Sequence, residues 1–560
     1  MARSPLFAAL RRILRSSPAA TDGAAPAGPS RRQVLAALGA AAAIPAVPAL
    51  SGCGDDGGGG SDKTIVVVGG GVAGLTAAWF LQQVGAKVTV YESSMRPGGR
   101  MFTDRTSLAG GQLCELGGEL VDTDHFVIPA LCDQLGLTLD DLPMATAGLE
   151  QDIFFFDGRK ITDEELATAF RPVAAKMQLA ITASDGDDAA SQAEFARIDA
   201  MSIPMWLMSE AGLPGQSMIR RLLEVAYLEE YGLEADQQSA WNLLYLIDSM
   251  TPDPFRVFGD SDERFHIHQG SAAVPEGLAA ALGDAVVLNH ALTKVVASGD
   301  AFTLTFSSDG GDVTVDADHV VYALPFTRLR QCDLTAAGLS AGKLDIITNL
   351  GYGTNAKLMM QFSERHWETA HQSAGGTITD VGGNQLQTTW ATSRGQAGAQ
   401  GVLTNFVGGN RGLAMGQGSA EDQAQLALPL VDMIFPGTSA TYLANSAIRQ
   451  HWPSFVHNKG SYACYKVGQW SYFGMEGQRE GNQHFCGEHC SEDFQGYMEG
   501  GAETGSMVAA EVMDDLGFEK PALLAMFVDM LTAERPRASF HAGFGRRMRP
   551  SQVRRRKLPR

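Results

Sequence analysis

The sequence predicts an α/β fold of mixed (α+β) character, organised around one strand–turn–helix–strand unit near its start. A short apolar run at 65–68 leads into the glycine cluster 69–74, and a helix-like segment follows over 75–84. A second β-rich run at 87–91 ends on Glu92. This order of strand, tight turn, helix, strand and acid is typical of a dinucleotide-binding βαβ unit.

The glycines of the cluster have separate predicted roles. Gly69 allows a sharp turn, Gly71 lets backbone N–H groups approach a pyrophosphate, and Gly74 lets the helix pack closely on the strand. The helix N-terminus favours the negative phosphate. Glu92 suits an acceptor for ribose hydroxyls. Glycine clusters are often only turns, but here the strand, the helix and the terminal acid agree.

Two further glycine pairs, 98–99 and 117–118, suggest backbone pressed against a cofactor, with Arg100 available for a phosphate. The alternative is a pair of surface turns. The next segment is predicted to be a mostly helical insertion, because apolar residues recur at helical spacing. These recurrences lie at 126–137, 164–179, 220–231 and 241–250.

The β character returns at Arg264. A short helix at 275–282 is followed by predicted strands at 285–288, 294–296, 301–306, 313–315 and 319–325. A second mixed region spans 349–457, and a final block ends in a predicted helix at 502–516.

Lys357 lies inside an apolar strand, where a lysine is costly unless it has a partner. It therefore either reaches the surface or serves a site. His266 and His268 alternate on a predicted strand, but with no third ligand apparent we interpret them as ordinary polar positions. Cys486 and Cys490 lack the spacing and the companion pair of a zinc site. We predict no metal.

The first 53 residues resemble an export signal. Paired arginines, Arg31 and Arg32, precede an alanine-rich run that is broken by prolines and too weakly apolar for a permanent membrane span. They resemble a twin-arginine signal. The sequence Leu-Ser-Gly-Cys, ending at Cys53, resembles the box at which bacterial lipoproteins are lipidated. A glycine-rich linker at 54–61 follows. We predict a periplasmic or extracytoplasmic, lipid-anchored protein.

The charge is unevenly distributed. The whole chain has a net charge of −20, while residues 1–53 carry +5 and residues 535–560 carry +10, so the body between them carries −35. Such a body disfavours nucleic acid and attracts cations, amines among them, although solubility is an equally good explanation. The segment 518–560 is predicted to be a helix followed by a basic, disordered tail, which either rests on anionic lipid or is solvated.

Several motifs, taken together, resemble the flavin-containing amine oxidases, a family that includes monoamine, polyamine and L-amino-acid oxidases. The motifs are IVVVGGGVAGL, RPGGR, ELGGE, VVYALP, YGTNAKLMMQF, GSY and CGEHCSEDFQGYMEGG, in the family's order. The resemblance implies an FAD-binding, Rossmann-like domain interleaved with a substrate-binding domain of mixed sheet and helices. The expected FAD-binding segments are 62–125, 264–328 and 458–517, and the expected substrate-binding segments are 126–263 and 329–457.

The resemblance also implies residue roles. Lys357 matches the lysine that holds a water at flavin N5, and Tyr462 and Tyr497 match two rings that enclose the amine. Gln495 and Glu119 are further expected substrate contacts. The expected FAD contacts are Gly69, Gly71, Gly74, Glu92, Arg100, Gly117, Gly118, Glu119, Leu120, Leu292, Glu488, Gly496, Tyr497 and Met498.

The implied reaction is oxidation of a primary or secondary amine by FAD, with O₂ as acceptor, to an imine or aldehyde, ammonia or amine, and hydrogen peroxide. Ser461 stands where monoamine oxidases carry their flavin-linking cysteine, so FAD is expected to be non-covalent. Leu120 stands where venom-type amino-acid oxidases carry an arginine for the substrate carboxylate, which argues for an amine without one. Glu119 either meets a second ammonium group, as in a diamine or polyamine, or bonds the backbone. An L-amino-acid oxidase and a non-catalytic flavin-binding lipoprotein are the alternatives, and a homodimer is left open.

Overall fold

The computed structural model describes residues 62–186 and 188–532. The predicted signal at 1–53, with its lipidation site Cys53, and the linker at 54–61 lie outside the described residues, as does the basic tail.

A parallel five-stranded sheet gathers strands from three distant parts of the chain. Its order is β10 (Val286–Val287), β2 (Lys87–Tyr91), β1 (Thr64–Val68), β14 (His319–Tyr322) and β21 (Gln483–Phe485). The predicted strand–helix–strand unit is confirmed, with the helix, α3 (Val72–Gln83), beginning three residues earlier than its apolar pattern suggests. Both faces of β1 are covered, as expected for a parallel sheet.

The alternating residues of β1 belong to two different cores. Ile65 and Val67 share a core with α3, α11 (Ala273–Leu282) and α18 (Met498–Leu516). Val66 and Val68 pack on the opposite face against residues of a second sheet. That sheet has the order β13 (Gly311–Ala317), β12 (Ala301–Ser308), β11 (Ala291–Ser298) and β15 (Asp333–Ala336).

A seven-stranded sheet forms the core of the other half. Its order is β20 (Ile448–His451), β16 (Ala356–Phe362), β19 (Gly401–Val407), β18 (Thr388–Ala391), β17 (Ser373–Thr379), β7 (Glu150–Phe156) and β8 (Arg159–Ile161). All residues of β16, Lys357 included, are buried. The helix α17 (Ala420–Ile434) packs on this sheet.

The insertion after residue 126 is mostly helical, as predicted, but it also supplies strands. Its helices are α4 (Val127–Leu135), α6 (Asp163–Ala183), α7 (Ala189–Asp199), α8 (Ile203–Ser209), α9 (Met218–Tyr231) and α10 (Ala240–Leu246). The strands β7 and β8 were not expected there; β7 pairs in parallel with β17, which lies far along the chain. The predicted helix at 241–250 ends early because Ile247 adopts an extended conformation.

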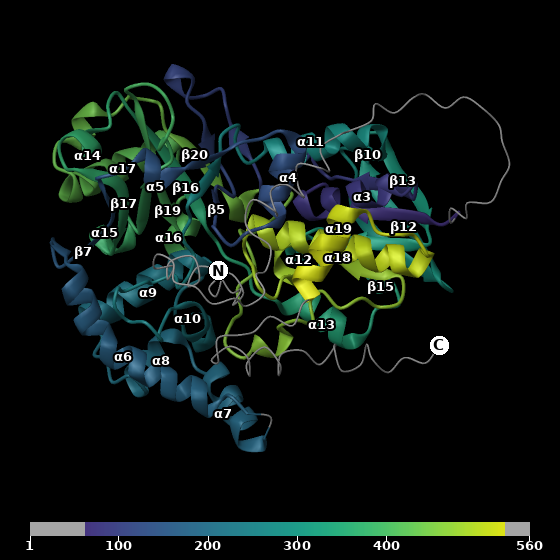
Figure 1. Ribbon diagram of the computed structural model, residues 1–560, viewed down its shortest axis with the longest axis horizontal. Helices are drawn as coiled ribbons and strands as arrows, with labels where there is room; N and C mark the ends of the chain where they lie inside the picture. The colour runs from purple at the N-terminus through teal and green to yellow at the C-terminus, as the bar shows by residue number, and fades with distance from the viewer. Residues whose placement is uncertain (1–61, 187, 533–560) are drawn as a thin grey trace, which may run out of the picture.

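Figure 1 shows the seven-stranded sheet at one end of the molecule, α3 and α18 at the other, and the α6–α10 group projecting below. A small three-stranded sheet has the order β5 (Leu120–Val121), β9 (Phe265–Ile267) and β6 (Leu139–Asp141), and β3 (Thr103–Asp104) pairs with β4 (Cys114–Glu115). The remaining helices are α5 (Leu142–Ala145), α12 (Phe326–Leu329), α13 (Ala341–Asn349), α14 (His366–Thr369), α15 (Val381–Asn384), α16 (Gly409–Ala414) and α19 (Ala522–Thr532), with 3₁₀ turns at Ala109–Gly111, Gly283–Ala285, Thr438–Thr441, Trp452–Ser454, Trp470–Tyr472 and Glu488–Cys490. None of the helices in 62–532 combines the length and apolarity needed to cross a bilayer.

Candidate active site

One cavity of about 310 Å³ is lined by residues of the parallel sheet, of α9 and of the seven-stranded sheet. It brings together nearly all the site residues predicted from the sequence. Those that line it are Gly69, Gly71, Glu92, Arg100, Gly117, Gly118, Glu119, Leu120, Leu292, Lys357, Tyr462, Glu488, Gln495, Gly496, Tyr497 and Met498. Gly74 lies behind the wall.

The glycine cluster has the geometry that each of its roles requires. Gly69 has a φ of +110°, which favours glycine, and a Cβ at Gly74 would lie 2.1 Å from the Gly69 carbonyl oxygen. The helix α3 therefore lies as close to β1 as the backbone permits. Gly71 is the residue that caps α3, and a Cβ there would meet no atom within 4 Å. Open space at a helix N-terminus suits a phosphate.

Glu92 closes the glycine turn from the end of β2. Its carboxylate accepts hydrogen bonds from the Gly70 N–H at 2.7 Å and the Ser94 N–H at 2.8 Å. A carboxylate has about four acceptor positions, so Glu92 keeps capacity for ribose hydroxyls at the cavity wall.

Arg100 and Glu488 link an early and a late part of the chain. The Arg100 guanidinium donates to Glu488 at 2.6 Å and to the Ser461 carbonyl at 2.8 Å. Glu488 also accepts from the Gly496 N–H at 3.0 Å. This ion pair therefore fixes the loop that carries Tyr462 relative to the loop that carries Tyr497.

Lys357 does not reach the surface; it serves the cavity. Its Nζ donates to the Gly117 carbonyl at 2.8 Å, to the Glu115 carbonyl at 3.3 Å and to Glu119 Oε2 at 2.8 Å. The other oxygen of Glu119 accepts from Trp390 Nε1 at 2.9 Å and from the Thr392 hydroxyl. Both carboxylate oxygens of Glu119 are thus engaged by the protein itself.

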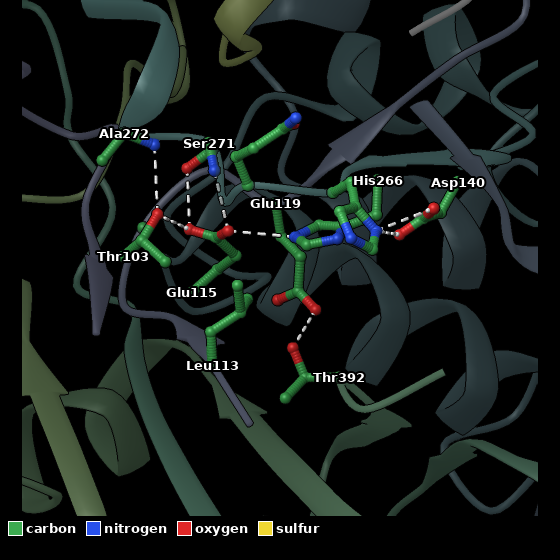
Figure 2. A network of polar contacts seen from close by, with 12 residues as sticks. Thr103, Leu113, Glu115, Glu119, Asp140, His266, Ser271, Ala272 and Thr392 are labelled. Atoms are coloured by element: carbon green, nitrogen blue, oxygen red, sulfur yellow. Dashed lines mark hydrogen bonds and ion pairs between the residues drawn. The ribbon is translucent and has the colours of Figure 1, made fainter. Parts of the chain in front are cut away.

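A second buried pair lies next to this one (Figure 2). Glu115 Oε1 is 2.9 Å from His266 Nε2 and accepts from the Ser271 N–H at 2.8 Å, while Oε2 accepts from the Thr103 and Ser271 hydroxyls, each at 2.7 Å. His268, the next predicted polar histidine, is exposed and contacts Asp140 instead. The two histidines therefore contact different carboxylates.

The pKa values of the two pairs follow their surroundings. Burial alone raises the pKa of Glu119, but the positive charges of Lys357 and His266 and the hydrogen bond from Thr392 bring the pKa below its ordinary value. Burial lowers the pKa of His266, but Glu115 and Glu119 outweigh it and raise the pKa overall. Glu119 is therefore held as a carboxylate.

The two predicted tyrosines lie on the cavity wall: Tyr462 is close to Gly496 in space, and Tyr497 follows it in the chain. The Tyr462 hydroxyl donates to the Glu229 carbonyl at 3.3 Å, and the Tyr497 hydroxyl donates to Ser261 Oγ at 3.4 Å. A Cβ on Gly496 would lie 3.7 Å from the Tyr462 ring. Burial raises the pKa of both phenols well above the usual value, so both rings are neutral.

The structure shows the protein partners or the secondary-structure positions of four other predicted contact residues. Gln495 Nε2 donates to the Tyr465 hydroxyl at 2.9 Å, so the amide already has a protein partner. Leu292 lies in β11, and its carbonyl accepts from Cys332 Sγ at 3.2 Å. Leu120 begins β5, and Met498 begins α18. The roles assigned to these residues from the resemblance stay predictions.

Three glutamates on the cavity wall escaped the sequence analysis: Glu229 and Glu230 of α9, and Glu263. Burial, together with Glu230, raises the pKa of Glu229 well above its usual value. Glu263 has a φ of +41°, is an exposed residue and lines the same cavity. Desolvation of its carboxyl, with the negative charges of Asp122 and Glu230, raises the pKa of Glu263 to about 8. The sequence alone does not identify Glu229 and Glu230 as site residues, because adjacent acidic residues are also common on the exposed faces of helices.

The residues present fit FAD. Gly71 leaves room beside the positive end of α3, and Glu92 stands at the neighbouring strand end. At the other end, a Cβ at Gly117 would lie 1.8 Å from the Arg100 carbonyl and one at Gly118 would lie 2.8 Å from Met498 Sδ. Glycine backbone without side chains therefore forms the cavity wall where a flat ring system would pass.

The fold and the sequence have known counterparts. An L-amino-acid oxidase of Siganus canaliculatus is 24% identical over 440 residues, covering 75% of this chain and 79% of its own length. The flavin-dependent L-tryptophan oxidase RebO of Lentzea aerocolonigenes is 24% identical over 471 residues, covering 75% and 92%. Cyclohexylamine oxidase of Brevibacterium oxydans superposes with a TM-score of 0.69 at 20% identity over 82% of this chain and all of its own. Putrescine oxidase bound to putrescine superposes with a TM-score of 0.67 at 19% identity, covering 81% and 99%.

The family model for flavin-containing amine oxidoreductases matches residues 72–513, which include α3, Lys357 and both cavity tyrosines. With that match over most of the chain, and with the predicted residues gathered around one cavity that fits FAD, the protein belongs to the family of flavin-containing amine oxidoreductases.

Proposed function

We propose that this flavin-dependent oxidoreductase oxidises a primary or secondary amine that carries no carboxylate, with O₂ as the acceptor. The carrying observation is the group of carboxyls on the cavity wall, among which Glu229 and Glu263 have raised pKa values that a bound ammonium group would lower again. Glu229, Glu230 and Glu263 line it together with aromatic side chains. A carboxylate-free cation, and a diamine or polyamine in particular, complements such a wall.

The cations on the cavity wall support this choice, because each of them, among the described residues, has another task. Arg100 is paired with Glu488, and Lys357 with Glu119. Arg328 of α12 donates a hydrogen bond to Gln331 Oε1. A substrate carboxylate would thus lack a dedicated partner, and its desolvation would be uncompensated.

FAD, when bound, supplies hydride acceptance from the carbon that bears nitrogen. The chain's own residues then orient the amine and exclude water. Tyr462 and Tyr497 present neutral aromatic faces, which attract an amine without needing a carboxylate on it. Glu92, Gly71 and Arg100 would hold the cofactor. We propose non-covalent attachment, because Ser461 donates its hydroxyl to Asn355 Oδ1 at 2.5 Å and offers no thiol.

The alternative is an L-amino-acid oxidase, which is favoured by the names of the two curated relatives. A hydrogen peroxide assay separates the two activities. Purified protein is given putrescine, butylamine, tyramine and a panel of L-amino acids. Peroxide from the amines alone supports the proposal, and peroxide from amino acids alone supports the alternative. If no substrate yields peroxide or reduces the flavin, the protein is a flavin-binding module without this catalytic activity.

For the segment outside the described residues, we propose export by the twin-arginine route and lipid attachment at Cys53. The order of paired arginines, apolar run, Leu-Ser-Gly-Cys and glycine-rich linker supports it. Expression of the full chain with Cys53→Ala tests it: the wild type should partition with membranes and the variant with the soluble fraction. Equal partitioning would argue against the lipid.

A further inference from the structure

Lys357 has no hydrogen atom left for a further partner in this structure. An ammonium group has three donors. The three acceptors around Nζ are the carbonyls of Glu115 and Gly117 and the carboxylate of Glu119. The side chain is 6% exposed and lies in a strand whose every residue is buried. The position of its charge is therefore set by these three protein oxygens.

Glu119 is the one charged partner among the three, and it is fixed independently of Lys357. Trp390 and Thr392 donate to its other oxygen from β18 and the residues after it. The Trp390 ring also lies under the ammonium, with Nζ 5.1 Å from its centroid. Glu119 thus ties the lysine of β16 to a second strand of the same sheet.

The two carbonyls are fixed in turn by the second ion pair. Glu115 accepts a hydrogen bond from Lys357 with its backbone carbonyl. Its carboxylate is paired with His266 and accepts from the Ser271 and Thr103 hydroxyls (Figure 2). Its side chain is fully buried. The backbone that receives Lys357 is therefore anchored on the side of the molecule that holds the cofactor cradle.

We propose that Glu119 is a positioning residue for Lys357, and that the Glu115–His266 pair anchors the carbonyls which complete the lysine's cradle. Glu119 then acts through the lysine and does not receive a second ammonium group of the substrate. This role of Glu119 concerns the proposed amine oxidation, and only the kinetic test below depends on that function.

The first test needs no catalysis. A double-mutant cycle compares the wild type with Glu119→Gln, Lys357→Met and the double variant in the holoenzyme, by chemical denaturation. Each single change leaves one buried charge unpaired and should raise the unfolding equilibrium constant by roughly a hundredfold to several thousandfold. The double variant removes both charges, so its effect should be far smaller than the product of the two. Simple multiplication of the single effects would overturn the proposed pairing.

Two further variants complete the cycle. Glu150→Gln removes one partner of the exposed Lys160–Glu150 pair and should change the unfolding constant little. Glu119→Asp keeps the charge and should recover part of the stability lost in Glu119→Gln. If Glu119→Gln alone fails to fold while the double variant folds, the coupling is supported; if both fail equally, the pairing is refuted.

The second test separates positioning from substrate binding by comparing butylamine with putrescine, which carries one more ammonium group. If Glu119 positions Lys357, Glu119→Gln lowers kcat for both amines by a similar factor, on the order of a hundredfold, with KM little changed. It then adds nothing in a Lys357→Met background. If Glu119 instead binds the second ammonium, KM rises for putrescine alone, and the proposal is wrong. If the wild type oxidises neither amine, the proposed function fails, while the unfolding cycle still decides the pairing.

Discussion

Gly71 and Gly74 lie one helical turn apart, yet their replacement by alanine should damage two different properties. A Cβ at Gly74 would lie 2.1 Å from the Gly69 carbonyl oxygen, whereas close carbon–oxygen contacts are about 3.3 Å or longer. The helix α3 would have to retreat by roughly 1 Å, and forced overpacking of this kind costs about 1–3 kcal/mol. Gly74→Ala should therefore lower Tm even without cofactor.

Gly71→Ala should leave the fold nearly intact. Gly71 has a φ of −77°, which alanine adopts readily, and the added methyl group would meet no protein atom within 4 Å. Alanine is a poorer N-cap residue than glycine, at a cost of about 1 kcal/mol or less. The methyl group would, however, occupy the space beside the helix N-terminus that we assign to the FAD phosphates. The Kd for FAD should rise at least about tenfold, or about 1.4 kcal/mol.

The assay is FAD titration of the deflavinated variants by flavin fluorescence, together with thermal unfolding with and without FAD. Gly215→Ala is the control, because a Cβ there also meets nothing within 4 Å and Gly215 does not line the cavity. It should change neither quantity. The separate roles of the two glycines are contradicted if Gly71→Ala destabilises the cofactor-free protein as much as Gly74→Ala, or if Gly71→Ala binds FAD like the wild type.

Four further outcomes are expected. Tyr462→Ala should raise KM for amines on the order of tenfold while FAD stays bound, because a buried aromatic wall is lost; an unchanged KM places the ring outside the substrate site. Glu263 has a pKa of about 8, so its carboxyl ionises as the pH rises through that value. The KM for putrescine should fall over the same pH range, because the carboxylate attracts the ammonium groups of the substrate. Profiles of KM against pH should lose this fall in Glu263→Gln. Burial and the neighbouring His484 lower the pKa of His319 to about 4 from 6.5, so the unfolded chain binds more protons than the folded chain between these two pH values. The free energy of unfolding should therefore have its full value above pH 6.5 and decrease as the pH falls toward 4. Denaturation curves of His319→Gln at several pH values should show a smaller decrease. Acid precipitation should release FAD into the supernatant, since Ser461 replaces the linking cysteine; yellow precipitate would contradict non-covalent binding.

Much of the cofactor-binding side was predictable from sequence because its signals are local. The run from Thr64 to Glu92 contains both strands, the turn and the helix, so its apolar pattern and its glycines specify the unit without help from the rest of the chain. The same holds for the apolar strand around Lys357, whose buried charge demanded a partner. The family's motifs then named the remaining wall residues, and those residues line one cavity.

The identity of the partners was decided only by the tertiary structure. Lys357 and Glu119 are 238 residues apart, and Glu115 and His266 are 151 apart, so no local pattern links them. Glu119 faces the lysine because β16 and β18 belong to one sheet and because the Gly117–Gly118 backbone passes beside it. Glu263 enters the cavity through a left-handed backbone conformation that sequence periodicity does not report. Local sequence signals are thus enough to predict the cofactor-binding unit and the family. Which charges meet beside Lys357 depends on strand pairing across the chain, since residues 151 and 238 positions apart become neighbours only in the folded protein.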